Sequence, residues 1–280
     1  RPAVLLASFG ALGAWSGGSV DIGTALHALV AASFAAFAAG LWVACRHLPG
    51  ELLKSRATYR RSWISGSASF AAKGGIAVVN NYVDILLLGA LLASSADVGI
   101  YRVAAQVAVV GGIVYVSINA LVTQTFAVNL AKGDMNAVSH AARHSARLAF
   151  LASLPLPIIM LLFGDPLISL VFGVEFAAAA PIAVILLVGQ MINSGFGTAA
   201  SLLTVSDRGW TVTRWFAYGT LVNIAACCVL IPAWGMIGAA AANVAAGLLF
   251  NLAIWTVARN ELGIDTSILG RESLRGESEA

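Results

Sequence analysis

Long apolar runs follow one another along this chain and are separated by short polar segments. The runs fall near residues 3–15, 23–44, 63–93, 98–126, 146–172, 176–205, 211–231 and 235–258. A helix needs about 20 apolar residues to cross the hydrocarbon core of a bilayer. The runs lack the alternation of a β-barrel, and lipid offers backbone groups no other partners, so helices are the only spanning structure. The pattern predicts an all-α, polytopic transmembrane bundle of about eight spans.

Basic residues alternate from one connection to the next. Segments 45–62, 127–147, 206–214 and the chain after 258 carry them, whereas 16–22, 94–97, 173–175 and 232–234 contain neither Lys nor Arg. Basic connections are retained in the cytoplasm. This asymmetry therefore predicts a multi-pass protein whose basic connections and both termini are cytoplasmic.

The composition supports membrane insertion and gives little sign of other chemistry. Hydrophobic residues make up 59% of the chain and charged residues 10%, against about 25% charged in soluble domains. A net charge of +3 does not favour nucleic acid as a partner. Cys45, Cys227 and Cys228 have no CxxC spacing or suitably arranged histidines, so we expect no metal site.

Three ionisable side chains lie inside the predicted spans, at positions that cannot be assigned to the connections. Lys73 and Asp84 lie in the third span and Arg102 lies one turn into the fourth. A charge in mid-bilayer costs at least about 2.5–3.5 kcal/mol, so such residues usually face a bundle interior or an aqueous cavity. Lys73 and Asp84 are about 16 Å apart along one helix, too far to pair. Lys73 has no acidic partner at its own depth, which favours an anion-facing role, and snorkelling of its side chain toward the cytoplasmic surface is the alternative.

The depth of Asp84 suggests its partners. If the turn is centred near residues 94–95, Asp84 lies level with Gln106, and Arg102 lies one turn shallower. We expect Asp84 to reach Arg102 or Gln106. Two interpretations stay open: a pair that only fixes the hairpin, or a proton- or cation-linked carboxylate.

Polar side chains also recur at helical spacing within the spans. One stripe comprises Gln190, Asn193, Gly197, Ser201 and Thr204, and a second comprises Gln106, Tyr115, Asn119 and Thr123. Such stripes either join helices, at about 0.6 kcal/mol per hydrogen bond, or line a hydrophilic lumen. A third group, His140, Arg143, His144 and Arg147, shares one helix face at a predicted membrane boundary. Basic clusters there usually contact anionic headgroups, and capture of a substrate pyrophosphate is the alternative.

Enzyme signatures are missing from the sequence. There is no GxxxxGK[ST], HExxH or GxSxG motif and no paired carboxylates in a plausible pocket, so neither an enzyme nor a cofactor is predicted. A polymerase or ligase acting on lipid-linked sugars would need a sizeable external loop. Every connection on the predicted external side is short.

Several segments follow one another in an order typical of a known family. They are VDILLLG (83–89), DVGIYRVA (97–104), LFG (162–164), VFGVEF (171–176), GQ (189–190) with Asn193, and IPAWGMIGAA (231–240). Together they resemble oligosaccharide-lipid flippases of polysaccharide biosynthesis, within the multidrug/oligosaccharidyl-lipid/polysaccharide exporter superfamily. The resemblance covers roughly residues 63–258. Each motif is mostly apolar, and their order and spacing carry the specificity.

The resemblance implies one six-helix lobe of a two-lobed transporter, preceded by about two helices. Residues 1–44 would end the N-terminal lobe, 45–62 would be a basic cytoplasmic linker, 63–258 the C-terminal lobe, and 259–280 a polar, disordered cytoplasmic tail. The substrate would be an undecaprenyl-pyrophosphate-linked oligosaccharide in a bacterial cytoplasmic membrane. Membrane lipids and other polysaccharide assembly proteins are the further expected partners.

The family's cationic cavity would place Lys73 and Arg102 against the phosphate or sugar acids, and Asp84 at the family's acidic position. Gln106, Asn119, Gln190, Asn193 and Ser201 would line the path. Two alternatives are kept. A multidrug exporter of the same superfamily should have a cavity dominated by carboxylates and aromatic rings, and a truncated, non-transporting membrane scaffold is the other.

Overall fold

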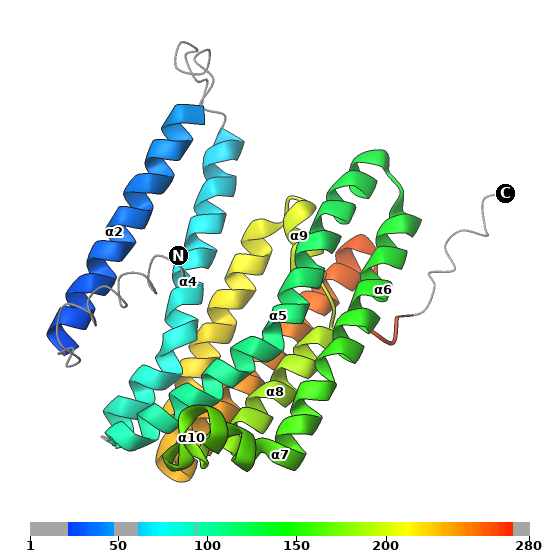
Figure 1. The fold of residues 1–280 in the computed structure, drawn as a ribbon. Helices are drawn as coiled ribbons and strands as arrows, with labels where there is room; N and C mark the ends of the chain where they lie inside the picture. The colour runs from blue at the N-terminus through cyan, green and yellow to red at the C-terminus, as the bar shows by residue number, and fades with distance from the viewer. Residues whose placement is uncertain (1–21, 48–60, 93, 271–280) are drawn as a thin grey trace. The chain divides into compact units, whose positions relative to one another are not determined.

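The computed structural model describes residues 22–47, 61–92 and 94–270 (Figure 1). The chain divides into two units, Arg1–Arg60 and Arg61–Ala280. The described part of the first unit is helix α2 (Ile22–His47), whose large apolar side chains, Phe34 and Phe37 among them, are mostly exposed. The predicted span at 3–15 lies outside the described residues.

The second unit consists of helices joined by short turns. They are α4 (Arg61–Leu92), α5 (Ser95–Lys132), α6 (Met135–Ser153), α7 (Pro155–Phe172), the 3₁₀ turn η1 (Val174–Phe176), α8 (Ala179–Gly195), α9 (Ala199–Val205) and α10 (Gly209–Leu262). The all-α prediction is confirmed. The predicted span at 176–205 is broken rather than continuous, because the chain bends by 48° between α8 and α9.

Helix α10 is a hairpin of two helical arms that meet at a sharp bend. Gly235 has φ 57° and ψ −133°, which interrupts the helix three residues after Pro232. The rings of Phe216 and Phe250 are 5.4 Å apart between centroids, whereas a straight helix would separate them by about 50 Å. The two arms correspond to the predicted spans at 211–231 and 235–258.

Four described helical stretches are long and apolar enough to cross a membrane, or five if α8 and α9 form one broken span. They are the apolar part of α4, α5, α6 continued by α7, and α10. Because α10 folds into two arms, the four stretches would supply five crossings within the second unit, and the broken α8–α9 span would bring the number to six.

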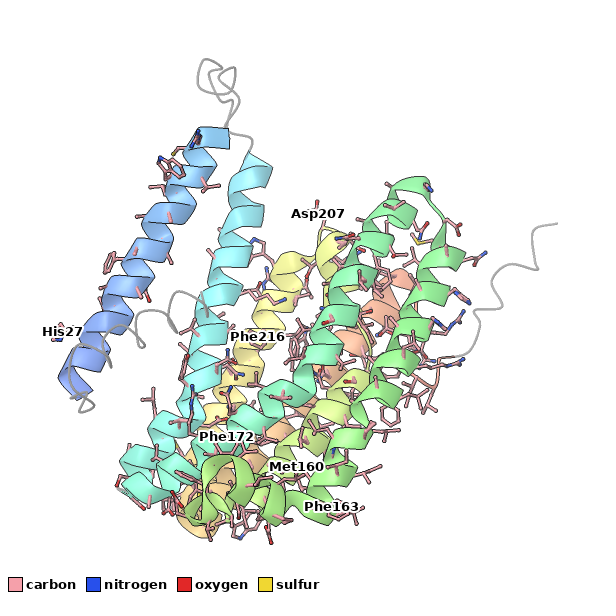
Figure 2. All side chains as sticks on the ribbon, viewed as in Figure 1. His27, Met160, Phe163, Phe172, Asp207 and Phe216 are labelled. Atoms are coloured by element: carbon pink, nitrogen blue, oxygen red, sulfur yellow. The ribbon has the colours of Figure 1, made fainter. Side chains whose placement is uncertain are left out.

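The outer faces of the second unit are apolar. Leu161 is 71% exposed, Leu170 is 82% exposed and Phe163 is 56% exposed (Figure 2). Soluble monomers rarely expose apolar patches of such extent, whereas lipid-facing helices require them. The interior is packed largely by small residues, including Ala239, Ala240 and Ala242, each fully buried, which lets helix backbones approach closely.

The turns of the second unit gather at two opposite ends. The α4–α5 turn, the α7–α8 turn and the bend of α10 lie at one end, and the α5–α6 and α9–α10 turns lie at the other (Figure 1). Arg208 forms an ion pair with Glu261, which joins the far ends of the two α10 arms. The end without basic connections is therefore separated from the end with them, as the predicted alternation requires.

The segment that follows α10 is packed against the bundle, so the expectation of a disordered tail is wrong for residues 263–270. Thr266 is fully buried, and its hydroxyl donates to the carbonyl of Phe196. The backbone N–H of Ile268 donates to the carbonyl of Gly195 at 3.0 Å. These bonds satisfy backbone groups that the break between α8 and α9 leaves without helical partners.

Asp265 closes this segment onto the second α10 arm. Burial alone would raise its pKa, but hydrogen bonds from Trp255 and from the backbone and hydroxyl of Ser267, together with nearby Arg259, lower the pKa below its ordinary value. The ionised carboxylate is therefore the form that holds the turn at neutral pH.

Substitution of Gly197 by alanine should loosen the attachment of the C-terminal segment. Gly197 has φ +73°, and an added Cβ would clash with the backbone carbonyl of Thr266. We expect a loss of about 1–3 kcal/mol in unfolding free energy, measured as a lower thermal midpoint of the detergent-solubilised protein. Gly74→Ala is the control, because a Cβ added there points into open space. Equal midpoints for the two variants would contradict the prediction.

Candidate functional site: a polar cavity in an apolar bundle

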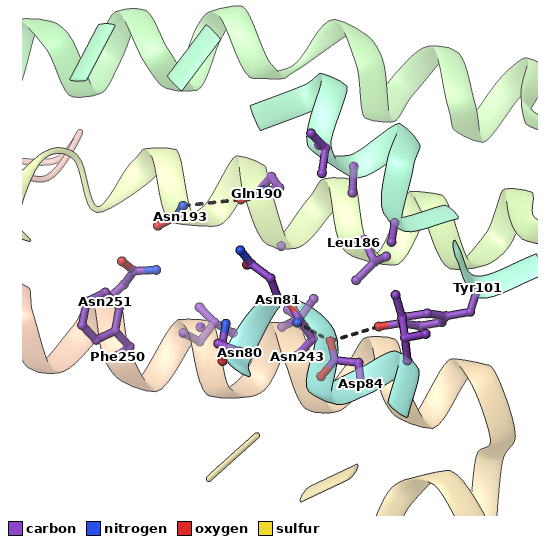
Figure 3. Close-up of a pocket in the computed structure, with 18 of the residues that line it drawn as sticks. Asn80, Asn81, Asp84, Tyr101, Leu186, Gln190, Asn193, Asn243, Phe250 and Asn251 are labelled. Atoms are coloured by element: carbon purple, nitrogen blue, oxygen red, sulfur yellow. Dashed lines mark hydrogen bonds between the residues drawn. The ribbon is translucent and has the colours of Figure 1, made fainter. Parts of the chain in front are cut away.

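The second unit contains a partly open cavity of about 330 Å³ between α4, α5, α8 and both arms of α10 (Figure 3). Its polar lining is dominated by six amide side chains, which are Asn80, Asn81, Gln190, Asn193, Asn243 and Asn251. Asp84 supplies the carboxylate among the described lining residues, and Tyr101, Phe216 and Phe250 supply aromatic rings. The cavity is thus a concentration of hydrogen-bonding groups within an apolar bundle.

Asp84 is the most heavily bonded side chain of the cavity. Its exposed fraction is 5%. Oδ2 accepts from the amide of Asn243 at 2.6 Å and from the hydroxyl of Tyr101 at 3.2 Å (Figure 3). Oδ1 accepts from the amide of Asn223 at 2.7 Å, and the Cys227 thiol lies 3.7 Å away.

These donors come from separate parts of the chain. Asp84 belongs to α4, Tyr101 to α5, Asn223 to the first arm of α10 and Asn243 to the second. Asn223 and Asn243 are 20 residues apart, so both reach one carboxylate only because α10 folds back at Gly235. The carboxylate thereby joins three helices through four of the bundle's crossings.

The expected partners of Asp84 were wrong. In the described structure the carboxylate pairs with neither Arg102 nor Gln106, and its α5 partner is Tyr101. The depth argument identified the correct turn of α5 but not the correct face. Adjacent residues point about 100° apart around a helix, so Tyr101 is buried while Arg102 is exposed, with its guanidinium 5.8 Å from the Tyr82 ring centroid.

The predicted site residues fall into two groups. Gln190 and Asn193 line the cavity beside Asp84, and the Asn193 amide donates to Gln190 Oε1 at 3.4 Å. The described lining of the cavity does not include Lys73, Arg102, Gln106, Asn119 or Ser201.

Two pairs of residues from the predicted stripes join helices. The Ser201 hydroxyl donates to Asn119 Oδ1 at 2.8 Å, linking α9 to α5. The Tyr115 hydroxyl donates to the carbonyl of Gly197 at 3.2 Å, at the break between α8 and α9. The part of the stripe on α8 faces the cavity, whereas the part on α9 contacts α5. The roles proposed for these residues in substrate binding stay predictions.

Sequence reasoning missed Tyr101, Asn223 and Asn243 as site residues. Each asparagine is a strong hydrogen-bonding group near the middle of an otherwise apolar predicted span, and that isolation was an available signal. Their convergence on Asp84 depends on the α10 hairpin. Within the described residues no group of three His, Cys, Asp or Glu side chains is placed to hold a metal ion.

The fold matches part of the fold of MATE transporters. The chain is similar to a multidrug resistance MATE family transporter of the MOP superfamily in an outward-facing conformation, with a TM-score of 0.61 and 18% identity over 73% of this chain and 46% of that one. A MATE structure in the bent conformation gives a TM-score of 0.59 and 19% identity over 76% of this chain and 49% of that one. This chain spans about half the length of those transporters.

The family is fixed by sequence. The model of a polysaccharide biosynthesis protein family matches residues 11–181, more than half of the chain, and the chain belongs to that family. No curated protein is a significant match. A membrane protein of polysaccharide biosynthesis with a MATE-like fold agrees with the resemblance seen in the sequence.

Removal of the Asn243 side chain should destabilise the bundle through Asp84. Asn243→Ala deletes the shortest hydrogen bond to a buried carboxylate, and a hydrogen bond to a charged group contributes about 1.5–3 kcal/mol. We expect a lower thermal midpoint in detergent. Asn251→Ala is the matched control, since Asn251 lines the same cavity two turns further along the same arm without bonding to Asp84. A midpoint for Asn243→Ala no lower than that of the control would argue against the prediction.

Proposed function

We propose that this chain supplies one six-helix lobe of a flippase that moves a lipid-linked oligosaccharide or polysaccharide precursor across a bacterial cytoplasmic membrane. The observation that carries the proposal is the amide-lined cavity within an apolar bundle. Membership in a polysaccharide biosynthesis family supports a glycan substrate, and the MATE-like fold supports transport. The substrate class is an undecaprenyl-pyrophosphate-linked oligosaccharide, a precursor of surface polysaccharides such as lipopolysaccharide or exopolysaccharide.

The cavity chemistry suits sugars better than organic cations. An amide both donates and accepts hydrogen bonds, as sugar hydroxyls do, and six amides surround a single described carboxylate here. A site for a cationic drug would concentrate carboxylates instead. The hydroxyl groups of a sugar could therefore exchange their water hydrogen bonds for bonds to Gln190 and Asn193.

Lys73 and Arg102, which lie outside the described lining of the cavity, are proposed to attract the phosphate groups or sugar acids of the substrate. Lys73 lies on α4 three turns before Asp84 and is half-buried, and Arg102 is exposed beside Tyr82. Gln106, Asn119 and Ser201 are proposed to belong to the same path. A second lobe would complete the path, because this chain spans about half the length of the transporters that share its fold.

Transport would proceed by alternating access of the two lobes, with both ends of this chain on the cytoplasmic side. Asp84 is proposed to link the movement to a proton or a small cation. A carboxylate buried in a bundle is stabilised by donors, by protonation or by a bound cation. Three of its neighbours, Tyr101, Asn223 and Asn243, lie on elements that would move if a proton or cation changed the charge at Asp84.

Export of surface polysaccharide tests the proposed path. In a deletion host complemented by the full-length gene, a Gln190→Ala, Asn193→Ala double variant should reduce export by about 30-fold, because two hydrogen bonds to substrate contribute about 2 kcal/mol together. Lys73→Ala should also reduce export. Polysaccharide on the cell surface is quantified at matched expression of the membrane protein.

The matched control is Ser117→Ala with Thr125→Ala, since both hydroxyls are exposed and bond to carbonyls of their own helix. Export equal to that of the control in all cavity variants would refute the path. Absence of rescue by the well-expressed wild-type gene, together with raised resistance to cationic drugs, would support the alternative of a multidrug exporter. Absence of both activities would favour the non-transporting scaffold.

Asp84→Asn tests coupling separately from substrate binding. The full-length protein in vesicles should translocate substrate faster when a proton or sodium gradient is imposed. In Asp84→Asn the rate should be the same with and without the gradient, because the charge that would bind the proton or cation is gone. Asp265→Asn is the control, as Asp265 lies beyond the end of α10. Gradient-dependent translocation that survives in Asp84→Asn would exclude Asp84 as the coupling group.

A further inference from the structure

One face of α6 carries four basic side chains that the cavity does not use. His140, Arg143, His144 and Arg147 follow the i, i+3, i+4, i+7 spacing that places residues on one side of a helix. The two imidazole rings are stacked, with centroids 6.0 Å apart and planes 11° apart. The four side chains therefore form a continuous basic strip.

The strip forms one wall of a separate hollow of about 570 Å³, and residues 268–270 form the other wall. Arg147 Nε donates to the carbonyl of Ile268 at 3.4 Å, so this bond uses the inner nitrogen of the guanidinium and not its two terminal nitrogens. The Cδ of Arg143 lies against Gly270, where an added Cβ would approach it to 3.1 Å. None of the described residues that line this hollow is acidic.

The second wall is a fixed part of the fold. Ile268 donates its backbone N–H to Gly195, and Thr266 donates its hydroxyl to Phe196. The hollow is thus built by packing between α6 and a segment anchored at the break between α8 and α9.

The basic strip gives way to an apolar surface one turn further along α6. Leu148 is 47% exposed and Leu151 is 61% exposed, and Leu269 at the rim of the hollow is 85% exposed. A basic group beside exposed leucines matches the boundary between lipid headgroups and acyl chains. A soluble anion would gain no binding energy from the leucines, because it has no apolar part to contact them.

We propose that this hollow binds the phosphate headgroup of an anionic phospholipid whose acyl chains lie along the adjacent leucines of α6. The guanidinium groups of Arg143 and Arg147 bind the phosphate oxygens, for which planar, paired donors are well suited. His140 and His144 supply further ring nitrogens. The bound lipid bridges α6 and residues 268–270, and so holds the C-terminal segment at the α8–α9 break.

The test compares lipid binding by the purified full-length protein with and without the strip. Each lipid is titrated into the protein, and native mass spectrometry measures how much phosphatidylglycerol and how much phosphatidylcholine the protein retains. The Arg143→Gln, Arg147→Gln variant should lose about 25-fold in its preference for phosphatidylglycerol, since each basic residue near a membrane surface contributes about fivefold. Lys132→Gln with Arg214→Gln removes the same charge outside the hollow and should retain the preference.

Further variants keep the test decisive if the arginine pair fails to fold. Arg143→Lys with Arg147→Lys keeps the charge and should preserve most of the preference, while His140→Gln with His144→Gln should weaken it. A preference unchanged in both the arginine-to-glutamine and the histidine variants would overturn the proposal. Displacement of the lipid by millimolar inorganic phosphate would overturn the lipid assignment, because the acyl chains would then contribute nothing.

Discussion

The buried carboxylate of Asp84 is the interaction on which the arrangement of the second unit depends. A charged or protonated carboxyl group in an apolar bundle requires hydrogen-bond partners, and an unpaired buried charge is strongly destabilising. Its three strong donors come from α5 and from both arms of α10. Satisfying this one group therefore fixes how three helices are rotated about their own axes.

The polar cavity follows from the same constraint. Once the α10 arms are held against α4 by Asp84, Asn243 and Asn251 of the second arm face Gln190 and Asn193 of α8 across the space that remains (Figure 3). Lipid-facing surfaces cannot use these amides, so they collect inside. Some residues that stabilise the bundle, such as Asn243, therefore also line the proposed substrate site. A transport defect in an Asn243 variant is interpretable only when the stability of that variant is measured as well.

The opposite end of the bundle shows a second use of polar contacts. The break between α8 and α9 leaves backbone groups open, and the C-terminal segment closes it through Thr266 and Ile268. The same segment forms one wall of the basic hollow on α6. A ligand in that hollow would contact a segment that is hydrogen-bonded to the helix break, and the break lies close in sequence to Asn193 of the cavity. The hollow at the membrane boundary is linked to the cavity in this way.

Much of the fold could be predicted from the sequence alone, because a membrane restricts which structures can cross it. Lipid forbids unpaired backbone groups, so run length and apolarity determined the helices and the two α10 arms, and motif order indicated the family. The rotation of each helix about its own axis could not be predicted from the sequence. Depth placed Asp84 beside the correct turn of α5, but only packing decided that Tyr101 rather than Arg102 meets it, that Ser201 bonds to Asn119, and that Asn223 and Asn243 converge. Hydrophobic pattern in lipid specifies which segments cross, whereas the faces that meet depend on contacts between residues far apart in sequence.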